Sequence, residues 1–131
     1  MRKFTLFAVL LAGSLLSCDR RSSLQEDFGQ EVQMVERKTT PSGAEVIARS
    51  GPVRSNWSVT AAWETQTTLS RAEYSKWVIS QLQPEFRVVR EDEAQLTLSK
   101  HEDNDTDVVE CQFTPTKEKL HVRVALSAYP D

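Results

Sequence analysis

The chain has 131 residues, with 16 basic and 19 acidic side chains and a formal net charge of −3. That length suits one domain with a modest core and leaves no room for a second domain. The mildly acidic balance disfavours binding to nucleic acid and electrostatic binding to anionic lipid.

The start of the chain has the pattern of a secretory signal. Arg2 and Lys3 give a short positive segment, and a nearly unbroken apolar run follows over residues 4–16. At thirteen residues, this run is shorter than the roughly 20 residues that span a bilayer core. We therefore predict that residues 1–17 are a signal peptide. Its removal takes two basic residues from the chain and lowers the net charge to −5.

The end of this segment, Leu15-Leu16-Ser17-Cys18, resembles the lipobox of bacterial lipoproteins. The resemblance covers only the chain up to this cysteine. It implies cleavage between Ser17 and Cys18, acylation of the Cys18 thiol with chains such as palmitate, and a membrane-anchored protein on the extracytoplasmic side, periplasmic in a Gram-negative source. Asp19 resembles the inner-membrane retention signal of enterobacterial lipoproteins, but the choice between inner and outer membrane stays open. Two alternatives give Cys18 no lipid: a signal cleaved elsewhere and an uncleaved anchor.

Residues 18–42 are predicted to be the lipidated N-terminus and a poorly ordered tether, because the segment opens with a polar Asp-Arg-Arg-Ser-Ser run. Apolar residues from Leu24 to Val35 recur at helix-like intervals, yet Gly29 interrupts them. The stretch 31–37 also fits a short alternating strand, so helix and strand both remain open there.

The predicted sheet begins after this tether. Turn signals at Pro41-Ser42-Gly43 and Ser50-Gly51-Pro52 flank a candidate short strand over residues 45–48. From Trp57 to Glu64, one set of alternate residues is apolar and aromatic, which is typical of a half-buried strand. We expect residues 43–131 to form a single domain.

A helix is predicted over residues 71–82. Ser70 and Glu73 have the spacing of a capping box, in which the serine accepts from the third helical amide and the glutamate reaches back to the serine. Pro84 ends the helix because it disfavours helical geometry at the residue before it. The stripe expected to face the core contains Tyr74, Trp77, Val78, Gln81 and Leu82.

Four short strands at hairpin spacing follow the helix. Alternate residues of these strands are apolar and are expected to face inward: Phe86, Leu96, Leu98, Val109, Cys111, Phe113, Leu120, Val122, Val124 and Leu126. One helix on one face of an antiparallel sheet covers these apolar rows and leaves the other face in water. The sequence therefore predicts an α+β two-layer sandwich, with one main helix packed on a largely antiparallel sheet of four to five or more strands.

Four polar residues at outward positions are the candidate surface site: His101, Glu110, His121 and Arg123. Polar side chains are usual on a solvated sheet face. Two histidines without a third ligand at a recognisable spacing do not indicate a zinc site.

Asp103, Asp105 and Asp107 have the alternate spacing of a calcium-binding loop. Val108 and Thr114 occupy the positions where an EF-hand needs glycine and glutamate, so that motif is excluded. A weak surface cation site and an acidic hairpin tip remain, and the acidic tip is the favoured interpretation, because aspartate and asparagine are common in turns.

The other candidates have a structural interpretation. Cys111 lies in the inward row of its strand and is predicted to be a small core residue rather than a reactive thiol. With Cys18 acylated, it has no disulfide partner. Trp57, Trp63 and Trp77 are more typical of core packing than of a ligand groove. Arg49 and Arg54 are more typical of solvated loops than of an anion site.

The sequence contains no glycine-rich phosphate loop and no Gly-x-Ser-x-Gly or His-Glu-x-x-His motif. We therefore expect no enzymatic activity, cofactor or metal. The expected function is that of a membrane-tethered extracytoplasmic lipoprotein acting as an interaction or structural module. The lipid on Cys18 is expected to anchor the protein in the membrane. The outward sheet face or an edge strand is expected to contact an extracytoplasmic protein partner. The alternative is a small-ligand-binding lipoprotein with a groove between helix and sheet.

Overall fold

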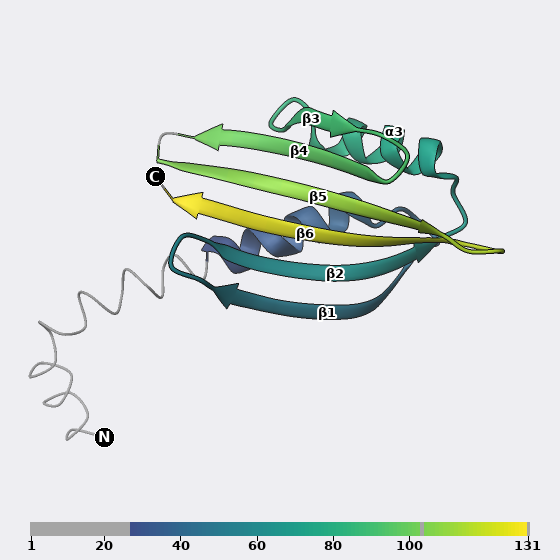
Figure 1. Ribbon diagram of the computed structural model, residues 1–131, viewed down its shortest axis with the longest axis horizontal. Helices are drawn as coiled ribbons and strands as arrows, with labels where there is room; N and C mark the ends of the chain where they lie inside the picture. Colours follow the sequence, from purple (N-terminus) through teal and green to yellow (C-terminus); the bar gives the residue numbers. More distant parts are fainter. Residues whose placement is uncertain (1–26, 103, 131) are drawn as a thin grey trace, which may run out of the picture. The chain divides into compact units, whose positions relative to one another are not determined.

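The computed structural model describes residues 27–102 and 104–130. The predicted signal peptide, Cys18 and the first part of the predicted tether lie outside the described residues. Along the chain, a helix over residues 27–39 comes first, and the elements labelled in Figure 1 follow. These are β1 Glu45–Arg54, β2 Val59–Thr67, α3 Arg71–Leu82, β3 Arg87–Glu91, β4 Gln95–Glu102, β5 Asp105–Pro115 and β6 Leu120–Pro130.

The six strands form one antiparallel sheet in the order β1-β2-β6-β5-β4-β3. The last strand, β6, lies between β2 and β5, so it joins the hairpin made before α3 to the strands made after it. The helical segment 32–39 and α3 both lie on one side of the sheet (Figure 1). The predicted α+β fold, with a helix over 71–82 on an antiparallel sheet, is confirmed. The sheet has six strands, and a second helix accompanies α3.

Residues 27–39 are helical, where the sequence suggests a poorly ordered tether up to residue 42. Gly29 does not end this helix, because a glycine costs a helix only about 1 kcal/mol relative to alanine. Val35 and Thr39 lie one turn apart and are both fully buried, so packing of this face stabilises the helix. No helix among the described residues is long and apolar enough to cross a bilayer.

β1 continues through the turn predicted at residues 50–52 and ends at Arg54. Its register with β2 shifts between Ser50 and Val53, which marks a bulge. Gly51 there has a φ of +87°, and a Cβ at this position would lie 2.7 Å from the carbonyl oxygen of Thr60. Only glycine fits this backbone, so the predicted break is a bulge within a longer strand.

α3 starts and ends where the sequence predicts. The Ser70 hydroxyl accepts from the Glu73 N–H at 3.1 Å, and Glu73 Oε1 accepts from the Ser70 N–H at 3.1 Å. The hydrogen bond with the Ser70 backbone, and to a smaller extent that with the Ser70 side chain, lowers the pKa of the Glu73 carboxyl. The buried face differs from the predicted stripe, since Trp77 is half-buried and Gln81 is exposed. It is formed instead by Tyr74, Ser75, Val78 and Leu82.

The core lies between the helices and the covered face of the sheet. The ring of Tyr74 on α3 meets Phe113 on β5 edge to face, with ring centroids 5.9 Å apart. The inward rows predicted on β4, β5 and β6 are confirmed. Their buried residues are Leu96, Leu98, Val109, Cys111, Phe113, Leu120, Val122, Val124 and Leu126.

Thr39 connects the first helix to β2 and to α3. The Trp63 indole N–H donates to Thr39 Oγ1 at 3.1 Å, and the Thr39 hydroxyl donates to the Val35 carbonyl at 2.9 Å. The Tyr74 hydroxyl donates to the Thr39 carbonyl at 2.6 Å. All of these side chains are buried. Because a buried donor without an acceptor is costly, this network fixes the two helices against the sheet.

Thr39→Val should lower the free energy of unfolding by about 1–3 kcal/mol, because the buried Trp63 N–H loses its acceptor while the side-chain volume is kept. Urea unfolding followed by tryptophan fluorescence measures the loss. Thr39→Ser is the matched control, since it keeps the hydroxyl and removes one methyl group, at a cost of about 0.8 kcal/mol. A valine variant as stable as the wild type, beside a serine variant that is less stable, would mean that volume, not hydrogen bonding, matters at this position.

Candidate functional site: the open face of the sheet

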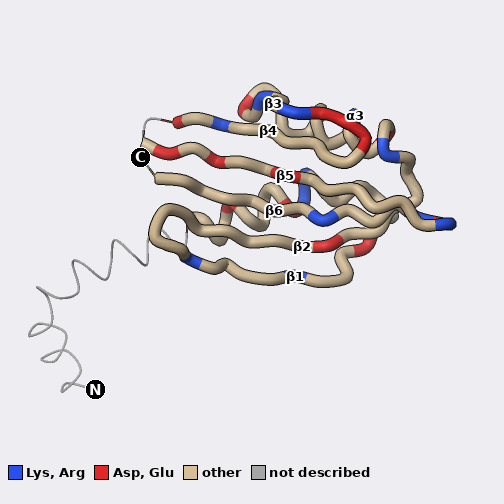
Figure 2. Tube along the Cα trace, in the orientation of Figure 1, with Lys and Arg blue, Asp and Glu red and all other residues tan. Residues whose placement is uncertain are grey.

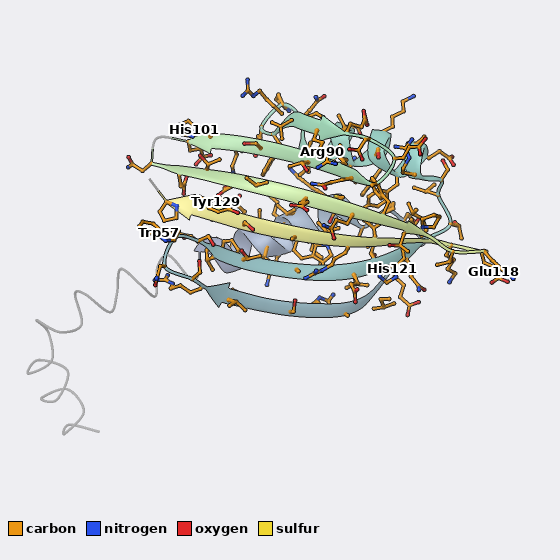
Figure 3. All side chains as sticks on the ribbon, viewed as in Figure 1. Trp57, Arg90, His101, Glu118, His121 and Tyr129 are labelled. Atoms are coloured by element: carbon orange, nitrogen blue, oxygen red, sulfur yellow. The ribbon has the colours of Figure 1, made fainter. Side chains whose placement is uncertain are left out.

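The sheet face away from the helices is open, and its side chains form rows that cross the strands (Figure 3). Thr60 and Ser127 meet in one such row, with their hydroxyl oxygens 2.9 Å apart. Small side chains occupy the part of the face formed by β2 and β6. The central row contains Ser50, Ala62, Ala125, Glu110, Thr97 and Arg90, in strand order from β1 to β3.

A charged cluster on this face centres on Glu64. His121 Nε2 lies 3.3 Å from Glu64 Oε1, and the two side chains are partly exposed. Arg123 is the cross-strand partner of Glu64. The structure thus brings together two of the four predicted surface residues, His121 and Arg123. It adds Glu64, whose outward phase is evident from the sequence but whose neighbours depend on β2 pairing with β6.

The other two predicted surface residues lie apart from this cluster. His101 Nδ1 is 2.8 Å from Thr106 Oγ1, toward the other end of the sheet from His121 (Figure 3). Glu110 Oε1 accepts from Gln112 Nε2 at 3.0 Å in the middle of the face. The four residues therefore share a face but do not form one site.

The cluster around Glu64 has the chemistry of a hydrogen-bonding and ion-pairing surface. Nucleophilic catalysis needs a nucleophile within hydrogen-bond reach of a base. The cysteine in the described part of the chain, Cys111, faces the covered side of the sheet. Within residues 27–102 and 104–130, no three His, Cys, Asp or Glu side chains gather closely enough to hold a metal ion.

Both edges of the sheet are shaped against adding another strand. β1 carries two register shifts and Pro52, and its Arg49 bonds Glu36 of the first helix at 2.7 and 3.2 Å. The side-chain hydrogen bond to Glu36 raises the pKa of Arg49. β3 has only five residues and a shift between Val88 and Arg90. Bulges, proline, charge and short length all oppose edge pairing, which leaves the open face as the broader contact surface.

Trp57 is 80% exposed, which contradicts the prediction that it packs in the core. It lies in the turn between β1 and β2, so the alternation that places Trp63 inward does not extend to it. The Ser55 N–H donates to the Ser58 carbonyl at 2.8 Å, and the two hydroxyl oxygens are 3.0 Å apart. These bonds close the turn and hold Trp57 outside it.

An open groove of about 540 Å³ lies between α3 and the turn that joins β3 to β4. Arg71 and Lys76 line one side, and the acidic residues 91–93 line the other. Arg71 Nη1 donates to the Asp92 carbonyl at 3.3 Å across the groove. Small-molecule sites are mostly apolar and enclosed, so this charged and open groove lacks their usual features.

A charged pair on the covered face was missed by the sequence analysis. Asp107 is only 3% exposed, and its Oδ2 lies 3.5 Å from Lys100 Nζ on the neighbouring strand. The Lys100 ammonium also lies 5.1 Å from the centre of the Phe86 ring. Extending the inward alternation of β4 and β5 by one step would have placed both residues here. Asp107 therefore belongs to the interior rather than to an acidic turn.

No protein-family model matches this chain, and no curated protein is significantly similar to it. Among solved structures, the fold is similar to the crystal structure of LpqN, which is involved in cell envelope biogenesis of Mycobacterium tuberculosis. The match has a TM-score of 0.42 and 14% sequence identity, and it covers 70% of this chain and 69% of that one. At these values the similarity carries no conclusion about function.

Cys111 should make stability depend on pH above pH 9. Burial, and to a smaller extent the charge of Glu110, raises the pKa of the Cys111 thiol from 9.0 to about 12, against a lowering by the Tyr74 hydrogen bond. Between these values the unfolded chain loses the proton and the folded chain keeps it. The free energy of unfolding should therefore fall as pH rises, by up to about 1.4 kcal/mol per unit.

Urea unfolding at pH 7, 9 and 10 measures this slope before Tyr74, whose pKa burial raises well above 10.0, contributes strongly. Cys111→Ala should unfold more easily at every pH, because the core loses a side chain, but without the thiol's part of the slope. An identical slope in the alanine variant would show that Cys111 is not the titrating group.

Proposed function

We propose that this chain is a lipid-anchored, extracytoplasmic interaction module without enzymatic activity, and that the open face of its sheet contacts a protein partner. The observation that carries the proposal is the contrast between the two faces. One face is covered by helices and filled with buried side chains, while the other presents rows in which small and neutral polar residues outnumber charged ones. The cores of protein interfaces are likewise depleted of charged residues.

The anchor rests on the chain before the described residues. A positive segment, a short apolar run and Leu15-Leu16-Ser17-Cys18 occur together in the order of a lipoprotein signal. Each buried acyl CH₂ contributes about 0.8 kcal/mol, so more than one long chain on Cys18 gives stable attachment. The lipid would then keep the domain at the membrane on the extracytoplasmic side. Inner and outer membranes are both compatible with this anchor.

A protein partner fits the open face better than nucleic acid or a small molecule does. The acidic net charge opposes binding to a polyanion. The groove beside α3 is open and lined by charges of both signs, which disfavours the small-ligand alternative. On the open face, Glu64, His121 and Arg123 add polar groups at one end, where they can select the orientation of a partner.

A photo-reactive amino acid at Thr97 or Ser127, both on the open face, should form a discrete cross-link to one protein in intact cells. The same group at Glu118, at the tip of the turn between β5 and β6 (Figure 3), or at Lys76, on the outer side of α3, should not. Denaturing gels of affinity-purified chain measure the cross-links. Cross-links of equal yield from all four positions, or none from the open face, would contradict the proposed contact surface.

Cys18→Ser should leave an unprocessed and unacylated precursor, because the acyl acceptor is lost. Growth with a radioactive fatty acid, followed by purification of the chain, measures acylation, and membrane fractionation reports where the protein lies. Cys111→Ser is the matched control and should still be labelled. Incorporation of fatty acid that survives Cys18→Ser would rule out this cysteine as the anchor.

A further inference from the structure

One end of the sheet carries three exposed apolar side chains from two distant parts of the sequence. Val53 is 66% exposed at the end of β1, Trp57 is 80% exposed in the next turn, and Tyr129 is 44% exposed near the end of β6. Figure 3 shows Trp57 and Tyr129 at the same end of the sheet. Val53 pairs with Thr60, so it shares the open face with Tyr129. We call these three residues the aromatic end.

The aromatic end is held in shape rather than left loose. The hydrogen bonds of Ser55 with Ser58 close the turn that carries Trp57. Tyr129 pairs with Thr106 inside the sheet, so its backbone is fixed by β5. Exposing two aromatic rings to water is unfavourable for an isolated domain. A fixed turn that holds a tryptophan outward therefore indicates a surface that meets something less polar than water.

Figure 1 shows the helical segment 32–39 running along the covered face away from the turn between β1 and β2, so the N-terminal end of this segment is the one closer to the aromatic end. Thirteen residues lie between Cys18 and Val32, and even a fully extended chain from one to the other spans at most about 50 Å. A lipid on Cys18 thus holds the domain close to the bilayer, at an effective concentration on the order of millimolar. Weak contacts with the bilayer surface then suffice.

From these observations we infer that Val53, Trp57 and Tyr129 form a membrane-contact surface, which rests among the lipid headgroups of the bilayer that holds the Cys18 anchor. This inference rests on the anchoring part of the proposed function. Tryptophan and tyrosine are enriched at membrane interfaces, because their rings are apolar while their N–H and O–H groups still reach water. The contact orients the domain, and it leaves the middle of the open face clear for a protein partner.

The charges at this end determine which lipid headgroups the surface can contact. Arg54 follows Val53, whereas Glu102 and Asp105 lie across the sheet at the turn between β4 and β5. Figure 2 accordingly shows basic and acidic segments together there, rather than a basic patch. A mixed end gives no net attraction to anionic lipid, which needs clustered lysine and arginine. The contact is therefore with zwitterionic headgroups, through the aromatic rings, and should change little with salt concentration.

The test uses the full lipidated chain in phosphatidylcholine vesicles, in which some headgroups carry a nitroxide that quenches nearby tryptophan. Floatation of the vesicles first shows whether the chain is anchored. The nitroxide should then reduce the tryptophan emission of the wild type, and Trp57→Phe should remove the quenched component. Trp77→Phe is the matched control and should keep it, because Trp77 lies on α3 and is half-buried. High salt should not restore the emission.

The outcomes separate this inference from the function on which it rests. A chain that floats with the vesicles, but whose emission the nitroxide does not reduce, overturns the membrane contact and leaves the anchor intact. A chain that does not float overturns both. Quenching that Trp57→Phe leaves unchanged overturns the assignment to this end. If the emission wavelength of Trp57 shifts as more chain is added per vesicle, but the nitroxide does not quench it, then Trp57 contacts a second copy of the chain. That result also overturns the inference.

Discussion

The hydrogen bonds of Thr39 are the interaction on which the arrangement of the layers depends. The hydrophobic effect has no direction, so burial of apolar surface does not by itself select one placement of a helix on a sheet. The Trp63 N–H and the Tyr74 hydroxyl do have direction, and both find their acceptors on Thr39. The network links residues that are 24 and 35 positions apart in the chain. These hydrogen bonds form in one placement of each helix on the sheet and are lost in shifted placements.

This fixed layer determines which surfaces remain for function. Helices occupy one face, so the interior includes even the charged pair of Lys100 and Asp107, whose ammonium and carboxylate approach to 3.5 Å. The edges are bulged, short or charged, and strand addition there is disfavoured. What remains is the open face, with the Glu64 cluster toward one end and the aromatic end at the other. The surfaces available for contacts in this fold are therefore those that the helices leave uncovered.

The sequence predicts what is local and misses what depends on pairing. Strand phase follows from alternation, so the burial of Cys111 is predicted correctly, and the Ser70 cap is readable because its partner is three residues away. The segment of the first helix was left open between helix and strand, because its stability comes from Thr39 meeting a strand far along the chain. Trp57 was misplaced because alternation does not mark where a strand begins. The meeting of His121 with Glu64 requires the strand order, which no local pattern contains.

The position of β6 has a consequence for how the protein is made. The strand closest to the C-terminal end of the described chain pairs with β2 and β5 in the interior of the sheet. Until it is synthesised, the β1–β2 hairpin and the β3–β5 meander have no shared strand, and the core between them stays open. The sheet therefore cannot close until β6 has been made, and the contacts that close it are long-range and slow to form.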